Sequence, residues 1–238
     1  TLMDGYVLVY EVMKAKHVFN AMSLMGVTPN IHTCNILING FCKSKMVDDS
    51  LSLFKEMHQK NMVPNTMTYS SLIDGLCKYG RISYVWDLIN EMRDRGQPPN
   101  VITHSTLIDA LCKNGHLDKA IAWFNKIKDE GIRPNEFTFT ILLDGLCKGG
   151  RLKDAQEVFQ DLLIKGHRIN VYTYTVMING LCKKGLLDEA LVMLSKMEDN
   201  GCIPDAVTFE IIINALFEKD ENVKEEKVLR EMIARGLL

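Results

Sequence analysis

Several residue types recur along this chain in one 35-residue register, and this repetition constrains the fold more than any other feature. Prolines recur as Pro29, Pro64, Pro99, Pro134 and Pro204. Cysteines recur as Cys42, Cys77, Cys112, Cys147 and Cys182. Threonines recur as Thr33, Thr68, Thr103, Thr138, Thr173 and Thr208. Chance does not align several residue types in one register, so the chain is predicted to be an array of equivalent units.

The register divides the chain into complete and partial units. The complete units are 31–65, 66–100, 101–135, 136–170 and 171–205. Residues 1–30 match the last 30 positions of a preceding unit, and residues 206–238 match the first 33 positions of a following one. We therefore expect one continuous repeat array that is part of a longer one.

Each unit carries two amphipathic helical patterns. In 171–205, one helical face is formed by Tyr174, Met177, Ile178 and Leu181, and a second by Leu187, Ala190, Leu191, Leu194 and Met197. Gly201 is expected to end the second helix, Pro204 prevents its continuation, and Asp205 can cap the helix that follows. No alternation typical of β-strands is present, so each unit is predicted to be a helical hairpin.

A single hairpin of this size cannot bury its own apolar faces, and stacking of neighbours builds a continuous core. The predicted fold class is therefore all-α: a right-handed α-solenoid superhelix of 35-residue helix-turn-helix repeats. Each first helix is expected to face the same inner surface, so residues at one repeat position should form a line along it.

Composition and motifs exclude several classes of protein. The chain is 47% hydrophobic and 24% charged, and no apolar run approaches 18 residues, so no membrane-spanning helix is predicted. Seven cysteines without a CxxC pair do not form a disulfide or zinc framework, and the repeated ones are interpreted as small buried hydrophobes. The six histidines form neither HxxxH nor HExxH, so no catalytic residue, metal or cofactor is expected.

The recurring text itself resembles a known family. Residues 173–190 are TYTVMINGLCKKGLLDEA, and residues 138–155 are TFTILLDGLCKGGRLKDA. This pattern resembles the P class of the pentatricopeptide repeat family, in particular its restorer-of-fertility-like plant members. Tetratricopeptide repeats have a 34-residue period and a tryptophan signature that Trp86 and Trp123 do not match.

The resemblance implies a non-enzymatic protein that binds single-stranded RNA, one base per repeat. The partner would be an organelle transcript, in a plant mitochondrion or alternatively a chloroplast, and the outcome would be transcript processing, stability or translation. Any targeting segment would lie outside this sequence. The runner-up hypothesis is a protein-binding α-solenoid scaffold, for which apolar pockets and varied residues would be expected.

In this family, the fifth and last residues of each repeat select the base. Carried over by position, these pairs are Asn35 with Asn65, Ser70 with Asn100, Ser105 with Asn135, Thr140 with Asn170, and Thr175 with Asp205. The resemblance implies the RNA core 5′-C/U-A-A-A-G-3′. A small hydroxyl leaves room for a purine, and an ionised Asp accepts hydrogen bonds from a base such as guanine. The alternative for the last positions is a helix N-cap, which is compatible with base selection.

Two further sets of residues complete the predicted interface. The second positions, implied to stack on bases, are His32, Met67, Ile102, Phe137, Tyr172 and Val207. Their alternative role is packing in the core against the next hairpin. Lysines that end the first helices, and could contact phosphates, are Lys43, Lys78, Lys113, Lys148 and Lys183. Their alternative role is to complement the helix dipole.

A formal net charge of −2 is unfavourable for RNA binding, for which a basic protein is expected. However, acids cluster in the predicted second helices, at Asp118, Asp154, Asp188 and Glu189. A basic stripe along the first helices is therefore compatible with this overall charge.

Overall fold

The computed structural model describes residues 1–164, 166 and 169–238. These residues form 14 helices and no strand, which confirms the all-α prediction. The first seven helices are α1 (Leu2–Leu8), α2 (Val12–Leu24), α3 (Ile31–Lys43), α4 (Val47–Gln59), α5 (Thr66–Lys78), α6 (Ile82–Asp94) and α7 (Val101–Lys113). The others are α8 (Leu117–Asp129), α9 (Glu136–Lys148), α10 (Leu152–Ile164), α11 (Val171–Lys183), α12 (Leu187–Asp199), α13 (Ala206–Phe217) and α14 (Asn222–Ala234).

The helices form two compact units, Thr1–His116 with α1 to α7 and Leu117–Leu238 with α8 to α14. The division falls between α7 and α8, which both belong to the repeat 101–135. It therefore does not follow the repeat register. None of the helices in the described part of the chain is long and apolar enough to cross a membrane.

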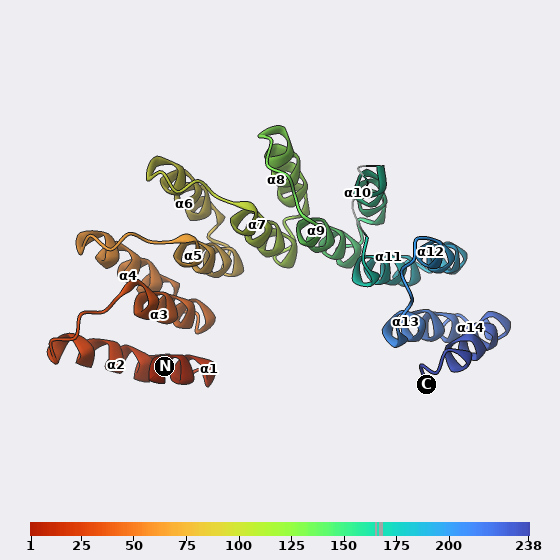
Figure 1. The fold of residues 1–238 in the computed structure, drawn as a ribbon, viewed down its shortest axis with the longest axis horizontal. Helices are drawn as coiled ribbons and strands as arrows, with labels where there is room; N and C mark the ends of the chain where they lie inside the picture. Colours follow the sequence, from red (N-terminus) through yellow and green to blue (C-terminus); the bar gives the residue numbers. More distant parts are fainter. Residues whose placement is uncertain (165, 167–168) are drawn as a thin grey trace. The chain divides into compact units, whose positions relative to one another are not determined.

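Within each unit, successive hairpins stack in the same way. In Thr1–His116 the first helices α1, α3, α5 and α7 pack side by side in sequence order, and in Leu117–Leu238 so do α9, α11 and α13 (Figure 1). The second helices α2, α4, α10 and α12 each contact the first helix of their own hairpin and that of the next; α4, for example, packs on both α3 and α5. The predicted stacking of helical hairpins is confirmed inside each unit, while the superhelical handedness stays a prediction.

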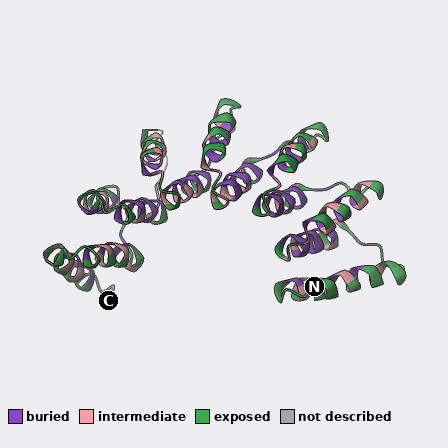
Figure 2. Cartoon of the chain, turned by 180° about the vertical axis from the view of Figure 1, so that it is seen from behind, coloured by how far each residue is buried: buried purple, intermediate pink, exposed green. Residues whose placement is uncertain are grey.

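The core of each unit lies mainly along the first helices (Figure 2). An aromatic ring from a second helix meets the ring at the fourth position of the next repeat, edge to face. These ring pairs are Phe54–Tyr69 at 5.5 Å, Phe124–Phe139 at 5.0 Å and Phe159–Tyr174 at 5.4 Å between centroids. Such pairs add about 0.5–1.5 kcal/mol to the free energy gained from burial alone. They fix the distance between one hairpin and the next.

The repeated glycine and cysteine of the first helices account for their close packing. A Cβ atom added to Gly180 would lie 2.6 Å from Cys147 Sγ, and one added to Gly75 would lie 2.4 Å from Cys42 Sγ. The glycine therefore accepts the cysteine of the preceding repeat. Burial raises the pKa of the Cys42 thiol to about 11 and that of Cys77 to about 12, so both stay protonated at neutral pH. The interpretation of the repeated cysteines as small buried hydrophobes is confirmed for Cys42, Cys77 and Cys182, whereas Cys112 and Cys147 are only half-buried.

Turn residues at left-handed backbone angles end the second helices. Gly201 has φ of 74°, as the sequence pattern predicts for a glycine after a helix, and Asn61 replaces glycine at φ of 56°. Asparagine is one of the few other residues that tolerate this conformation.

We predict that Gly180→Ala lowers the free energy of unfolding by about 1–3 kcal/mol, because the new methyl group overlaps Cys147 Sγ. The denaturation midpoint in urea measures the effect. Gly5→Ala is the matched control, since a Cβ atom there meets nothing within 4 Å, and it should leave the midpoint unchanged or slightly higher. Equal midpoints for Gly180→Ala and the wild type would contradict this packing.

Candidate nucleic-acid interface

The last residue of each repeat caps the first helix of the next repeat. The side-chain Oδ1 atoms of Asn65, Asn135, Asn170 and Asp205 accept hydrogen bonds from the backbone N–H of the threonine three residues later, at 2.9–3.1 Å. Asn100 does the same toward Thr103, at 3.1 Å. The predicted N-caps are confirmed.

Capping leaves one end of each of these side chains exposed. The Oδ1 atom is turned toward the helix, and no hydrogen bond from the Nδ2 amide of Asn65, Asn100, Asn135 or Asn170 is found among the described residues. The four asparagines therefore offer an N–H donor to solvent, whereas Asp205 offers a carboxylate oxygen, which only accepts.

The fifth residues lie deeper than the sequence indicates. Asn35, Ser105, Thr140 and Thr175 are between 3% and 8% exposed, and Ser70 is half-buried. They therefore form the floor of a surface and do not project from it. The structure gives the polar groups at this position a structural role, in the hydrogen bonds described next.

A threonine of the following repeat connects the fifth and last residues of one repeat. Thr140 Oγ1 lies 2.8 Å from Thr173 Oγ1, which lies 3.0 Å from Asn170 Oδ1. In the next repeat, Thr175 Oγ1 lies 2.8 Å from Thr208 Oγ1, which donates to Asp205 Oδ1 at 2.7 Å. The two predicted base-selecting side chains of each repeat are thus brought together through a third residue.

The same connection occurs in repeat 31–65, where it includes a direct bond. Asn35 Oδ1 accepts from Thr68 Oγ1 at 2.6 Å, and Asn35 Nδ2 donates to Asn65 Oδ1 at 3.1 Å. Sequence reasoning missed these threonines as site residues, although their 35-residue recurrence was visible. It used that recurrence to define the repeat register.

Ser70 differs from this pattern. Ser70 Oγ is buried and has no hydrogen-bond partner in the structure. Ser105 Oγ donates to the carbonyl of Val101 at 2.7 Å. Ser105 belongs to the first compact unit and Asn135 to the second, so the structure does not place this predicted pair.

The second-position residues are exposed. Met67, Ile102, Phe137, Tyr172 and Val207 are 54–66% exposed, and His32 is also exposed. The alternative interpretation, packing in the core against the next hairpin, is therefore wrong for all six. Exposed apolar side chains at the same place in five successive repeats are unusual for a surface without a ligand.

One open pocket gathers several predicted residues in a single repeat. It has a volume of about 610 Å³ and is lined by Asn135, Glu136, Phe137, Thr140, Asn170 and Tyr172. Thr140 and Asn170 are the predicted base-selecting pair, and Phe137 and Tyr172 are the second-position rings of this repeat and the next. The pocket therefore brings together two aromatic side chains and two polar side chains.

The repeated lysines are exposed and end their first helices, as predicted. Two of them form ion pairs four residues back along the helix: Lys113 with Asp109 and Lys148 with Asp144, both at 2.6 Å. The two carboxylates reduce the net positive charge along this row of lysines. Sequence reasoning missed them, although the i,i+4 spacing was readable.

Comparison with known proteins identifies the family. The model of the PPR repeat family matches residues 1–43, 29–78, 71–113 and 105–148, and two further PPR repeat models match residues 137–167 and 165–198. The chain belongs to the PPR (pentatricopeptide repeat) family. No curated protein sequence matches it significantly.

Solved PPR structures share the fold. The pentatricopeptide repeat protein PPR10 from maize is 22% identical, with a TM-score of 0.76 over 99% of this chain and 34% of that one. PPR10 in complex with an 18-nt psaJ RNA element is 24% identical, with a TM-score of 0.57 over 100% and 40%. The PPR domain of Arabidopsis thaliana protein-only RNase P 1, in complex with tRNA, is 19% identical, with a TM-score of 0.55 over 67% and 84%. This PPR chain thus spans about a third of the maize protein.

The second helices of the PPR hairpins carry most of the inter-repeat ion pairs. Within Leu117–Leu238, Asp118 pairs with Arg151 at 2.6 Å and Asp188 with Lys224 at 2.8 Å. These acids are therefore partly neutralised by the following PPR repeat. Exposed pairs of this kind contribute about 0–1 kcal/mol each to stability.

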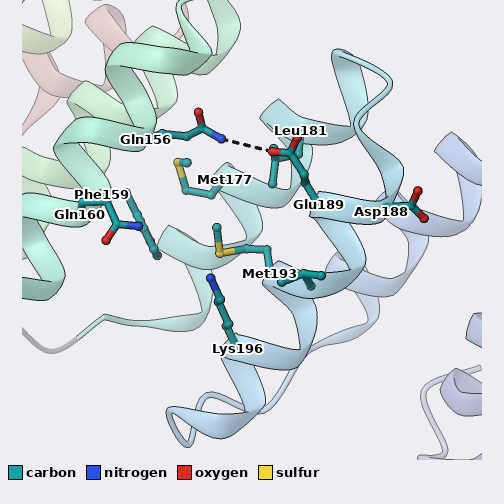
Figure 3. Close-up of a pocket in the computed structure, with 10 residues that line it drawn as sticks. Gln156, Phe159, Gln160, Met177, Leu181, Asp188, Glu189, Met193 and Lys196 are labelled. Atoms are coloured by element: carbon teal, nitrogen blue, oxygen red, sulfur yellow. Dashed lines mark hydrogen bonds between the residues drawn. The ribbon is translucent and has the colours of Figure 1, made fainter.

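A second pocket lies between second helices and lacks every predicted RNA-contacting residue (Figure 3). It has a volume of about 310 Å³ and is lined by Gln156, Phe159, Gln160, Met177, Leu181, Asp188, Glu189, Val192, Met193 and Lys196. Its floor is formed by buried residues such as Phe159 and Met177. No group of three His, Cys, Asp or Glu residues that could hold a metal ion occurs in the described PPR hairpins.

We predict that Asn135→Ala lowers the free energy of unfolding by about 1 kcal/mol, since it removes the cap on Thr138 N–H. Asn135→Ser keeps a capping oxygen and should retain most of this stability. Thermal and urea denaturation of both variants measure the difference. If both lost stability equally, the capping role would be refuted.

Proposed function

We propose that this PPR protein binds single-stranded RNA sequence-specifically, with one base per repeat. The observation that carries this proposal is the pocket of repeat 136–170, where the rings of Phe137 and Tyr172 border the pair Thr140 and Asn170. A base inserted between two aromatic side chains gains about 1–3 kcal/mol from stacking. Its edge would then face the two polar groups.

The cap geometry supports base selection at the last position. Asn170 turns its Oδ1 inward and its Nδ2 amide outward, so it would donate to an acceptor on the base. Asp205 presents a carboxylate oxygen, which would accept from N–H groups such as those of guanine. This contrast agrees with adenine for repeat 136–170 and guanine for repeat 171–205, within the proposed core 5′-C/U-A-A-A-G-3′.

The solved relatives are consistent with a nucleic-acid partner. PPR10 was solved with an RNA element and the RNase P 1 PPR domain with tRNA. At under 25% identity they share the fold alone, so RNA binding by this chain is our proposal. We further propose that the chain acts by binding and has no catalytic activity, and that it acts on an organelle transcript, in mitochondria or alternatively chloroplasts, through processing, stability or translation.

A protein-binding scaffold is the second candidate, favoured by the apolar floor of the pocket in Figure 3. That pocket occurs between α10 and α12, whereas the exposed second-position side chains recur in every repeat. The recurring feature fits a repetitive ligand such as RNA better than a protein with varied side chains.

The first test of the proposed function compares a labelled RNA containing 5′-CAAAG-3′ with a scrambled RNA of equal composition at one fixed salt concentration. We expect tighter binding of the first, measured by fluorescence anisotropy, because each repeat should select its base. Equal affinity for the two RNAs would refute sequence selection, and no binding to either would refute the function itself.

Replacing one stacking ring should weaken RNA binding by the loss of a single contact. Phe137→Ala is expected to reduce affinity for the 5′-CAAAG-3′ RNA about fivefold to hundredfold, through loss of one stacking contact. Val192→Ala is the matched control, because Val192 is also an exposed apolar residue, 54% accessible, but lines the pocket between second helices. A loss confined to Val192→Ala would instead favour that other pocket.

The lysine stripe is testable through salt dependence. Lys183→Ala should lower the slope of log affinity against log salt by about 0.7, as expected for one lost phosphate contact on single-stranded RNA. The effect should be the same for matched and scrambled sequences, because phosphates carry no sequence information. Lys196→Ala, an exposed lysine on α12, serves as the control and should leave the slope unchanged.

A further inference from the structure

We propose that the third-position threonine of each following repeat is a positioning residue for base selection: Thr173 acts on Thr140, and Thr208 acts on Thr175. The inference rests on the proposed RNA-binding function and adds a residue to its site. Thr173 is 2% exposed and Thr208 is fully buried, so neither can touch an RNA base directly. Any effect on the base must pass through the fifth and last residues that they contact.

The contacts of Thr140 keep its hydroxyl hydrogen inside the protein. Thr140 Oγ1 lies 2.8 Å from the carbonyl oxygen of Glu136 and 2.8 Å from Thr173 Oγ1. The carbonyl can only accept. The single hydrogen of Thr140 therefore goes either to Glu136 or to Thr173. In both arrangements the side of Thr140 toward the pocket presents a lone pair.

Thr173 also sets the orientation of Asn170. Both its backbone N–H, at 2.9 Å, and its hydroxyl, at 3.0 Å, lie against Asn170 Oδ1. Because two potential donors of Thr173 lie on this side of the Asn170 amide, the amide oxygen must face Thr173. The NH₂ group of Asn170 then faces the pocket. Thr173 therefore arranges an acceptor from Thr140 next to a donor from Asn170. Adenine presents the complementary pair on its Watson–Crick edge, an amino donor beside a ring-nitrogen acceptor.

In repeat 171–205, the same arrangement of three residues presents a different pair of hydrogen-bonding groups. Thr208 Oγ1 lies 2.7 Å from the Asp205 carboxylate, and Thr175 Oγ1 contacts both Thr208 and the Val171 carbonyl at 2.8 Å. A hydroxyl donates strongly to a carboxylate, so the Thr208 hydrogen is held by Asp205. The Thr175 hydrogen then goes to Thr208 or Val171. The pocket side offers two acceptors, which suit the two neighbouring N–H donors of guanine.

Ser70 provides a contrast within the same molecule. Its Oγ atom is buried without a partner, and the threonine of the following repeat, Thr103, lies 3.4 Å from Asn100 Oδ1. In repeat 66–100, Ser70 is therefore not joined to Asn100 through Thr103 by hydrogen bonds. A hydroxyl without an internal partner can rotate to donate or to accept, so this repeat should discriminate between bases less sharply than repeat 136–170.

The test uses the full 238-residue chain and four RNAs, 5′-CAANG-3′, that differ only in the base N opposite repeat 136–170. Thr173→Val removes the hydroxyl but keeps the N–H that Asn170 caps and nearly the same volume. We expect the preference of the wild type for adenine over the other three bases to fall roughly threefold to tenfold, the effect of one hydrogen bond. Thr173→Ser should restore the preference.

Two controls separate positioning from stability. Thr106→Val removes a hydroxyl that bonds only to its own helix, at Ile102, and should leave the base preference unchanged. Four further RNAs, varied at the cytosine opposite repeat 31–65, should show an unaltered preference in Thr173→Val. A variant that lost affinity equally for all four bases, or kept the full adenine preference, would overturn the inference.

The experiment distinguishes failure of the proposed function from failure of this inference. If the wild type bound all four 5′-CAANG-3′ RNAs equally, base selection itself would be refuted before any variant was compared. If the wild type preferred adenine and Thr173→Val behaved like it, only the role of the threonine would be refuted.

Discussion

Close packing of successive first helices is the constraint on which the described site depends. Gly180 has no side chain where Cys147 of the preceding repeat approaches, so α9 and α11 come near enough for polar groups to bond across them. The bond between Thr140 and Thr173 spans this contact. Weaker packing would break this bond and leave Thr140 and Thr173 with only the partners in their own repeats, Glu136 and Asn170. The polar contacts and the apolar core therefore support each other.

Much of the fold followed from periodicity. The 35-residue register, the amphipathic faces and the Gly201 and Asp205 signals located the helices and their caps, because these features depend on local chemistry. The sequence left open whether Phe137 and Tyr172 are exposed, since an apolar residue in a first helix packs in a core or faces solvent depending on how hairpins are rotated. That rotation is a property of the stack and not of one repeat.

The residues of the site were predicted from the sequence, but the hydrogen bonds that connect them were predicted only in part. Thr140 and Asn170 were predicted from the family resemblance, and the structure places both in one pocket. Their link through Thr173 was not predicted, because it joins residues 33 apart, two fewer than the repeat length. Such an offset is invisible in a comparison of equivalent positions. By contrast, the ion pair between Lys148 and Asp144 lies within one helix, at an i,i+4 spacing that can be read from the sequence.

The pocket of repeat 136–170 has a consequence for how such proteins can be recombined. Its walls include Tyr172, and its floor is supported by Thr173, both of which belong to the following sequence repeat. The structural module is therefore shifted by several residues relative to the 35-residue sequence unit. Exchange of a segment cut at Asn170 would separate a pocket from its own far wall. To transfer the pocket whole, a segment would have to run from Asn135 to at least Thr173.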